Sequence, residues 1–311
     1  MDGVLLLDKP IGPTSHDLVY KIRRLYGTRK VGHAGTLDPF ASGLLVMLIG
    51  QATKISNFLL NADKTYEAEL KLGEATDTLD HTGRITDAAP VTPLVRRDAE
   101  RVLSAMIGEF EQTPPMFSAI KVNGTPLHRA ARRGKEVERK AKIVHIHALT
   151  LLECGETRLR FRVVCSKGTY VRVLGSAIAE RLGTLGHLSA LRRTHSGQFS
   201  VSDAVMLEEL IAATEKGRGE EYLISLDRAL TNYHKVKLTP SAGCGVTHGV
   251  RPPAIEILAA DDFHCGDVVR LVDENERLLA LAKAVVDAGE TNDEQASSPF
   301  ELLRVFTESG A

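Results

Sequence analysis

Residues 32–43 read Gly32-His33-Ala34-Gly35-Thr36-Leu37-Asp38-Pro39-Phe40-Ala41-Ser42-Gly43. Three glycines and one proline restrict this stretch to a tight, non-repetitive backbone. One carboxylate, that of Asp38, lies at its centre, and an apolar run at 44–49 follows at once. An Asp before a proline is often only a turn or cap residue. A lone acid on a rigid loop beside a buried strand, however, is well placed to act as a nucleophile, which must be held in one orientation. The stretch therefore predicts a catalytic loop next to a core strand.

Length and composition set the first limits. The chain has 311 residues, of which 43% are hydrophobic and 25% charged, a mixture typical of globular proteins with room for two domains. No apolar run approaches the ~18 residues that span a membrane, and the first residues lack the basic stretch of a signal peptide. The four cysteines form no C-x-x-C pair, which favours reduced thiols. We therefore expect a cytoplasmic protein.

The net charge of −1 conceals an uneven distribution. Residues 261–311 carry twelve acidic and four basic side chains, whereas the first 260 residues carry 28 acidic and 35 basic ones. A basic excess attracts polyanions such as nucleic acids. We therefore expect phosphate contacts in the first 260 residues.

The full twelve-residue string resembles the catalytic motif of the TruB family of pseudouridine synthases, G-H-[TA]-G-[TA]-L-D-P-x-A-[ST]-G, and every fixed position matches. The resemblance implies an isomerase, a tRNA pseudouridine synthase that acts on uridine-55 of the T loop. It also implies base flipping and catalysis by Asp38 at C1′ of the target nucleotide. Isomerisation gains and loses no atom, so we expect no cofactor. One carboxylate also fits isomerisation better than glycoside hydrolysis, which uses two.

The stretch 166–172 reads S-K-G-T-Y-V-R and resembles a second motif of the family. Taken alone, it would predict a strand-to-helix turn with an arginine on the helix surface. A lone acid in a dry site, however, needs a cation nearby to stay ionised. The resemblance implies that Arg172 pairs with Asp38 and that Tyr170 orients the acid, so both are expected catalytic residues.

Four further residues have roles that the resemblance implies. Tyr66, on an alternating strand, would stack on the target base and assist proton removal, which makes it the fourth expected catalytic residue. His33 would fill the space left by the flipped nucleotide, and Leu191 would pack against the target base. Lys9 belongs to an N-terminal motif, and we group it with the RNA-binding residues as a support of the catalytic loop. Without the resemblance, Tyr66, His33 and Leu191 would be ordinary core or structural residues.

Residues 114–142 resemble an RNA-gripping insertion of the family and are rich in basic side chains. We expect RNA contacts from Lys121, Arg129, Arg132 and Arg133. The alternative is a solvated, charged helix and loop.

Strands and helices are mixed without a regular βαβ period, which predicts an α+β fold. The resemblance implies a mixed, largely antiparallel sheet flanked by helices, in a pseudouridine synthase domain at residues 1–232. Residues 233–311 are short apolar pieces separated by Gly, Pro and Asp, and resemble a PUA domain, a small β-rich RNA-binding module. Within the first domain we expect one helix capped by Ser15 and another, also capped, at 202–211.

Two other functions stay open. A guide-RNA-dependent relative of dyskerin would share these motifs, although the basic insertion favours a stand-alone enzyme. A tRNA-binding and folding chaperone would need no chemistry. Our expectation is a monomer that binds the T stem-loop of tRNA without a membrane, a guide RNA or a protein partner. We expect no metal, because His145 and His147 share one strand face without a third ligand.

Overall fold

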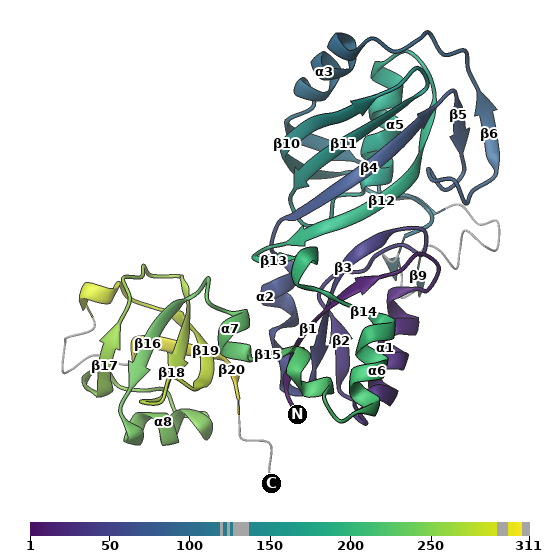
Figure 1. Ribbon diagram of the computed structural model, residues 1–311. Helices are drawn as coiled ribbons and strands as arrows, with labels where there is room; N and C mark the ends of the chain where they lie inside the picture. Colours follow the sequence, from purple (N-terminus) through teal and green to yellow (C-terminus); the bar gives the residue numbers. More distant parts are fainter. Residues whose placement is uncertain (119–120, 123–124, 127–136, 291–297, 307–311) are drawn as a thin grey trace.

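The computed structural model describes residues 1–118, 121–122, 125–126, 137–290 and 298–306 (Figure 1). Within these residues, eleven strands form the larger sheet, whose main path runs β14-β1-β3-β12-β4-β11-β10-β7. Its strands are β1 (Gly3–Lys9), β2 (Val31–His33), β3 (Ser42–Ile49), β4 (Lys64–Leu72), β7 (Gly108–Gln112), β10 (Lys142–Cys154), β11 (Arg158–Cys165), β12 (Gly186–Ser196), β13 (Phe199–Ser200), β14 (Val205–Met206) and β15 (Leu223–Ile224).

A smaller sheet lies to one side, at the C-terminal end of the chain (Figure 1). Its order is β17-β16-β18-β19-β20. Its strands are β16 (His234–Leu238), β17 (Ile257–Ala260), β18 (Val268–Val272), β19 (Leu278–Ala284) and β20 (Phe300–Val305). Two hairpins complete the strands, and they pair β5 (Glu74–Thr76) with β6 (Ile85–Ala88) and β8 (Lys121–Val122) with β9 (Thr125–Pro126).

Helices flank both halves of the larger sheet. Figure 1 shows α3 and α5 beside the half that holds β4, β10 and β11, and α1 and α6 beside the half that holds β1 and β2. The helices are α1 (Ser15–Leu25), α2 (Ser56–Leu60), α3 (Arg96–Ser104), α5 (Val171–Arg181), α6 (Leu207–Glu215), α7 (Leu226–Ala229) and α8 (Pro240–Thr247). Short 3₁₀ segments lie at Gly50–Ile55, Val201–Asp203, Gly219–Tyr222, Ala254–Glu256 and Ala288–Glu290. Among the described residues, no helix is long and apolar enough to cross a membrane.

Most strand pairs of the larger sheet are antiparallel. The pairs β1–β3, β4–β11, β4–β12 and β10–β11 run in opposite directions, whereas β12 pairs with β3, and β14 with β1, in parallel. The predicted α+β class, with a mixed and largely antiparallel sheet flanked by helices and a small PUA-like β domain, is therefore confirmed.

The N-cap of the first helix lies one residue before Ser15, the cap that the sequence predicted. Thr14 is the N-cap: its side chain accepts from the Asp17 backbone N–H, and the Asp17 carboxylate accepts from the Thr14 N–H, which is a capping box. Ser15 is the first helical residue, and its hydroxyl is buried against Leu37 instead. The apolar face of the helix, including Leu18 and Ile22, packs into the main core.

The helix expected at 202–211 begins later, at Leu207. Val205 and Met206 form β14 and pair in parallel with Leu7 and Asp8 of β1. Backbone hydrogen bonds of these two residues are therefore made with the edge of the sheet, and the helix starts only after them. Local propensity favoured the helix, but a strand distant in sequence decided the backbone.

The two sheets share a hydrophobic core. Leu281 and Phe306 belong to the same buried cluster as Val4 and Leu48 of the larger sheet. A buried ion pair lies in the same region, because Arg270 of β18 contacts Asp227 of α7 at 2.6 Å. We infer that the domain boundary expected between residues 232 and 233 separates two units that pack closely together.

Candidate active site

Asp38 lies on the motif loop, residues 34–41, which joins β2 to β3. Helix α1 anchors one end of this loop: Ser15 Oγ accepts from the Leu37 N–H at 2.9 Å and donates to the Leu37 carbonyl at 3.1 Å. The ammonium of Lys9, at the end of β1, donates to the carbonyls of Pro39 at 3.3 Å and Ala41 at 2.7 Å. These contacts hold the loop on both sides of the carboxylate.

The Lys9 side chain is fully buried, and burial lowers its pKa to about 8. Such an ammonium lies inside the loop and not on an RNA-facing surface. The geometry therefore favours the loop-supporting role of Lys9 over direct contact with RNA.

Arg172, near the start of α5, connects two carboxylates. Its Nε lies 2.9 Å from Asp38 Oδ2, and its Nη1 lies 3.5 Å from Asp80 Oδ2. The guanidinium also donates to the carbonyls of Thr78 at 2.7 Å and Phe117 at 2.8 Å. Only 3% of Arg172 is exposed, whereas the Asp38 side chain is 35% exposed. The Asp38 carboxylate is thus partly open to solvent, while the Arg172 guanidinium is buried and held by the two carbonyls.

Burial raises the pKa of Asp38, and the negative charge of Asp80 acts in the same direction. The adjacent Arg172 guanidinium opposes both effects. Without Arg172, burial would favour a neutral acid, which is a poor nucleophile and a poor base. The arginine is therefore the main group that favours the ionised form of Asp38, with a smaller contribution from Lys9.

The charge of Asp38 influences the pKa of two tyrosines. Tyr66 projects from β4, and Tyr170 directly precedes α5, where its backbone N–H donates to Gln112 Oε1 at 2.9 Å. Burial raises the pKa of both phenols, and the charge of Asp38 adds to this in each case. The structure therefore brings together Asp38, Arg172, Tyr66 and Tyr170, the four residues that the sequence placed in the catalytic group.

Comparisons with known proteins identify the family of this chain. A family model described as "TruB family pseudouridylate synthase (N terminal domain)" matches residues 23–171, and one described as "tRNA pseudouridylate synthase B C-terminal domain" matches residues 172–232. A protein named tRNA pseudouridine synthase B from Syntrophotalea carbinolica is 42% identical over the whole of both chains. The chain belongs to the TruB family of pseudouridine synthases.

Further relatives extend this result. A tRNA pseudouridine synthase B from Geobacillus kaustophilus is 48% identical, with 82% of this chain and 92% of that protein covered. A crystal structure of a Cbf5-Nop10-Gar1 complex contains a chain with a TM-score of 0.77 and 29% identity, over 98% of this chain and 85% of that one. The predicted family and the assignment as an isomerase are thus confirmed.

The residues that the sequence predicts to bind RNA lie at different depths. His33 ends β2 and is partly buried, and burial lowers its pKa. Leu191, in β12, is 7% exposed and packs in the main core. Only the backbone of Lys121, in β8, is described. Arg129, Arg132 and Arg133 lie outside the described residues, so their RNA contacts stay predictions.

Sequence reasoning missed two residues of the site. Asp80, which is 4% exposed, accepts from the hydroxyls of Thr78 and Thr82 and faces Arg172. Arg193 is buried beneath the motif loop. The only sequence signal for Arg193 was its place beside Leu191 in a family motif. Asp80 had no signal beyond an acidic turn.

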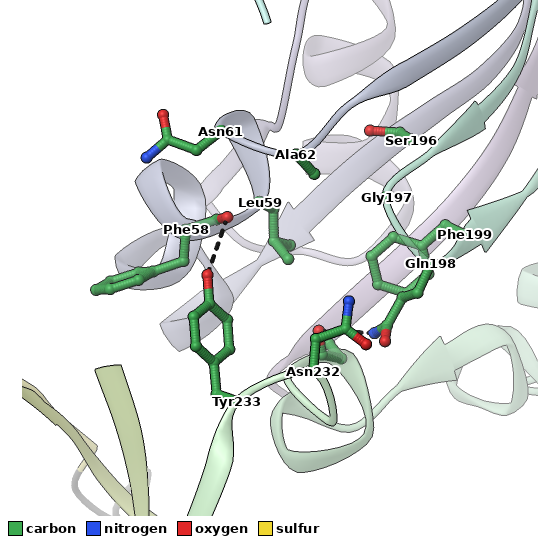
Figure 2. Close-up of a pocket in the computed structure, with 11 residues that line it drawn as sticks. Phe58, Leu59, Asn61, Ala62, Ser196, Gly197, Gln198, Phe199, Asn232 and Tyr233 are labelled. Atoms are coloured by element: carbon green, nitrogen blue, oxygen red, sulfur yellow. Dashed lines mark hydrogen bonds between the residues drawn. The ribbon is translucent and has the colours of Figure 1, made fainter. Parts of the chain in front are cut away.

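A cavity of about 220 Å³ lies outside this group, between α2, the β12–β13 turn and the segment that enters the second sheet (Figure 2). The Tyr233 hydroxyl donates to the Phe58 carbonyl at 3.3 Å across its rim. None of the four expected catalytic residues lines it, so we assign it no part in catalysis. Among the described residues, no three His, Cys, Asp or Glu side chains are grouped to hold a metal ion.

Proposed function

We propose that this enzyme converts uridine-55 in the T loop of tRNA to pseudouridine. Two relatives that cover most of the chain are named tRNA pseudouridine synthase B, which supports tRNA as the substrate. The observation that carries the proposal is the half-exposed Asp38 carboxylate, held on an anchored loop and paired with a buried arginine.

The reaction breaks the N1–C1′ bond of uridine and forms a C5–C1′ bond. Asp38 either attacks C1′ to form an ester or assists elimination to a glycal, and both routes need its ionised carboxylate. After the uracil turns and the new bond forms, the proton on C5 leaves and N1 takes up a proton. No atom is gained or lost, so the balance requires no oxidant or reductant.

The target uridine must leave its stack before C1′ and C5 can be reached. In our proposal, Tyr66 stacks on the flipped uracil and Tyr170 orients Asp38. Leu191 packs against the base, and His33 occupies the space that the nucleotide leaves. The basic residues of the 114–142 insertion hold the phosphates of the T arm.

We propose a stand-alone enzyme that acts in the cytoplasm as a monomer, without a guide RNA. The similarity to a chain from a Cbf5-Nop10-Gar1 complex favours, as a second candidate, an enzyme that works with partners. A third possibility, a tRNA-folding chaperone, requires binding but no isomerisation. One assay separates the stand-alone enzyme from the other two.

The assay is tritium release from uracil C5 in an unmodified tRNA T-arm stem-loop, without guide RNA or added metal. We expect release by the wild type and none by Asp38→Asn, since an amide is neither a nucleophile nor a base. Asp77→Asn, the same change on an exposed turn, serves as the matched control with wild-type release. Tight binding without release by the wild type would contradict the stand-alone enzyme and favour a partner-dependent synthase or a chaperone.

A further inference from the structure

We propose that Arg193 is a positioning residue of this reaction, which joins the motif loop to Tyr66 and favours the form of Tyr66 that accepts a proton. The proposal rests on the proposed function, because it assigns a task to Tyr66. Arg193 is 1% exposed and therefore acts through its neighbours and not by touching RNA.

In the described part of the chain, the guanidinium of Arg193 donates to three backbone carbonyls. Nε donates to Leu44 of β3 at 2.7 Å, Nη2 to Gly35 at 3.1 Å and Nη1 to Thr36 at 3.4 Å. Gly35 and Thr36 precede Asp38 by three and two residues. Arg193 therefore fixes the part of the motif loop that comes before the Ser15 contact at Leu37.

Strand register brings the same arginine to Tyr66. Arg193 in β12 lies directly opposite Tyr66 in β4, and directly opposed residues of an antiparallel pair share one face. On its other side, β12 pairs in parallel with β3, where Arg193 lies beside Gly43. A Cβ at Gly43, where φ is +98°, would clash with the Arg193 backbone, so this approach requires glycine. At Arg193, β12 is thus paired with β3 on one side and with β4 on the other.

The charge of Arg193 is unusual for a buried group. The buried guanidiniums of Arg172 and Arg270 each pair with an aspartate, whereas no acidic side chain in the described residues lies within ion-pair distance of Arg193. A buried cation without an anion is costly. It is useful where negative charge is needed nearby, and the Tyr66 phenolate is such a charge.

Three ionisable side chains influence the pKa of the Tyr66 phenol: Arg193 from β12, Cys165 from β11 and Asp38 from the motif loop. Burial raises the pKa of Tyr66, and Asp38 and Cys165 add to this, while Arg193 alone lowers it. The phenolate is the form that can take the C5 proton; that transfer gives a neutral phenol and leaves the C5–H electron pair in the uracil ring. Arg193 favours that form.

The test measures single-turnover pseudouridine formation against pH, together with tRNA affinity, for Arg193→Gln and Arg193→Lys. We expect Arg193→Gln to be about 100-fold slower, with the rate midpoint moved to higher pH because the phenolate has lost its cation. Arg193→Lys keeps the charge and should keep the midpoint near that of the wild type, although it reaches fewer carbonyls. Both variants should keep tRNA affinity.

Two controls separate positioning from general stability. Arg270→Gln removes another buried guanidinium, in the second sheet, and should lower the melting temperature without moving the pH midpoint. When Arg193→Gln is added to Tyr66→Phe, the single-turnover rate should fall by less than about threefold, because the effects of coupled residues are not additive. If Arg193→Gln does not fold, the same double-variant comparison is made with Arg193→Lys.

An unchanged midpoint with additive losses would overturn the inference and leave Arg193 a structural residue. A wild type that forms no pseudouridine would instead contradict the proposed function before Arg193 is tested. The two failures are therefore distinguishable.

Discussion

At the scale of the residue, the site depends on one arginine shared by two carboxylates. Arg172 contacts Asp38 closely and Asp80 at a longer distance, and only Asp38 faces outward. Asp80 is held by Thr78 and Thr82, so it cannot rotate away from the guanidinium. We infer that Asp80 sets the orientation of Arg172, which in turn aims Asp38.

We predict that Asp80→Asn slows turnover by about 10- to 100-fold, a range typical for loss of an orienting partner. The amide keeps the size of the side chain but removes the charge that faces Arg172. Asp77→Asn is the matched control, because Asp77 accepts from the Arg84 N–H in the same turn and does not face the site. Single-turnover tritium release measures both. Equal rates for the two variants would contradict the orienting role.

Asp38 should reduce the stability of the fold at neutral pH. Its pKa is raised in the folded state, so ionisation costs folding free energy once the pH exceeds the unfolded value of 3.8. This cost grows as the pH rises through the folded pKa and is then constant. Asp38→Asn removes it, as is common where activity requires a strained site.

We therefore predict that Asp38→Asn melts at a higher temperature than the wild type at pH 7, and that the difference shrinks as the pH falls toward 3.8. Thermal melts over this range measure the effect. Asp77→Asn, on an exposed turn, is the control and should show no such dependence. A lower melting temperature for Asp38→Asn at pH 7 would mean that the ion pair outweighs burial.

At the scale of the element, three neighbours immobilise the motif loop. Helix α1 contacts it through Ser15, strand β1 through Lys9, and strand β12 through Arg193. Each contact ends on a backbone carbonyl or N–H of the loop. The loop therefore keeps its shape without regular secondary structure of its own, because its polar backbone groups are satisfied from outside.

The first turn of α1 offers a matched pair of variants. We predict that Ser15→Ala and Thr14→Ala each cost about 1 kcal/mol of folding free energy, the former through its buried hydrogen bonds and the latter through its cap. Only Ser15→Ala should also slow the reaction, since only Ser15 contacts the loop. Denaturant unfolding and tritium release together test this. Equal rates for the pair would contradict the anchoring role of α1.

At the scale of the whole molecule, the two sheets form one packed unit. Phe306, directly after β20, belongs to the core cluster that includes residues of β1 and β3, and Lys54 Nζ lies 5.7 Å from its ring centroid. The Lys54 ammonium also donates to the Val305 carbonyl at 2.8 Å. These contacts tie the second sheet to the larger one. The two parts differ in charge, because residues 261–311 are mainly acidic and the first 260 residues carry a basic excess.

We predict that the wild type unfolds in a single thermal transition, because a shared core couples the two sheets. Phe306→Ala should split this into two transitions, since it removes about 3–5 kcal/mol of burial at the junction. Ile255→Ala, on the exposed surface of the second unit, is the control and should leave one transition. Differential scanning calorimetry measures all three. A single unshifted transition in Phe306→Ala would show that the junction contributes little.

The sequence by itself determined the family, the fold class and the four residues expected at the catalytic centre. Their identity is carried by short strings, 32–43 and 166–172, in which chemistry and turn geometry need particular residues at neighbouring positions. Local signals also placed Tyr66 on a strand, which is β4 in the structure, because alternation along a strand reports one buried face.

Only the tertiary structure decided which groups support the site. Ser15 meets Leu37 across 22 residues, Arg172 meets Thr78 across 94, and Arg193 meets Gly35 across 158. The same distance in sequence hid the role of Asp80 and moved the start of α6 to Leu207. A hydrogen bond between distant segments leaves no periodicity in either one, so the partners of a buried polar group become known only when the chain has folded around it.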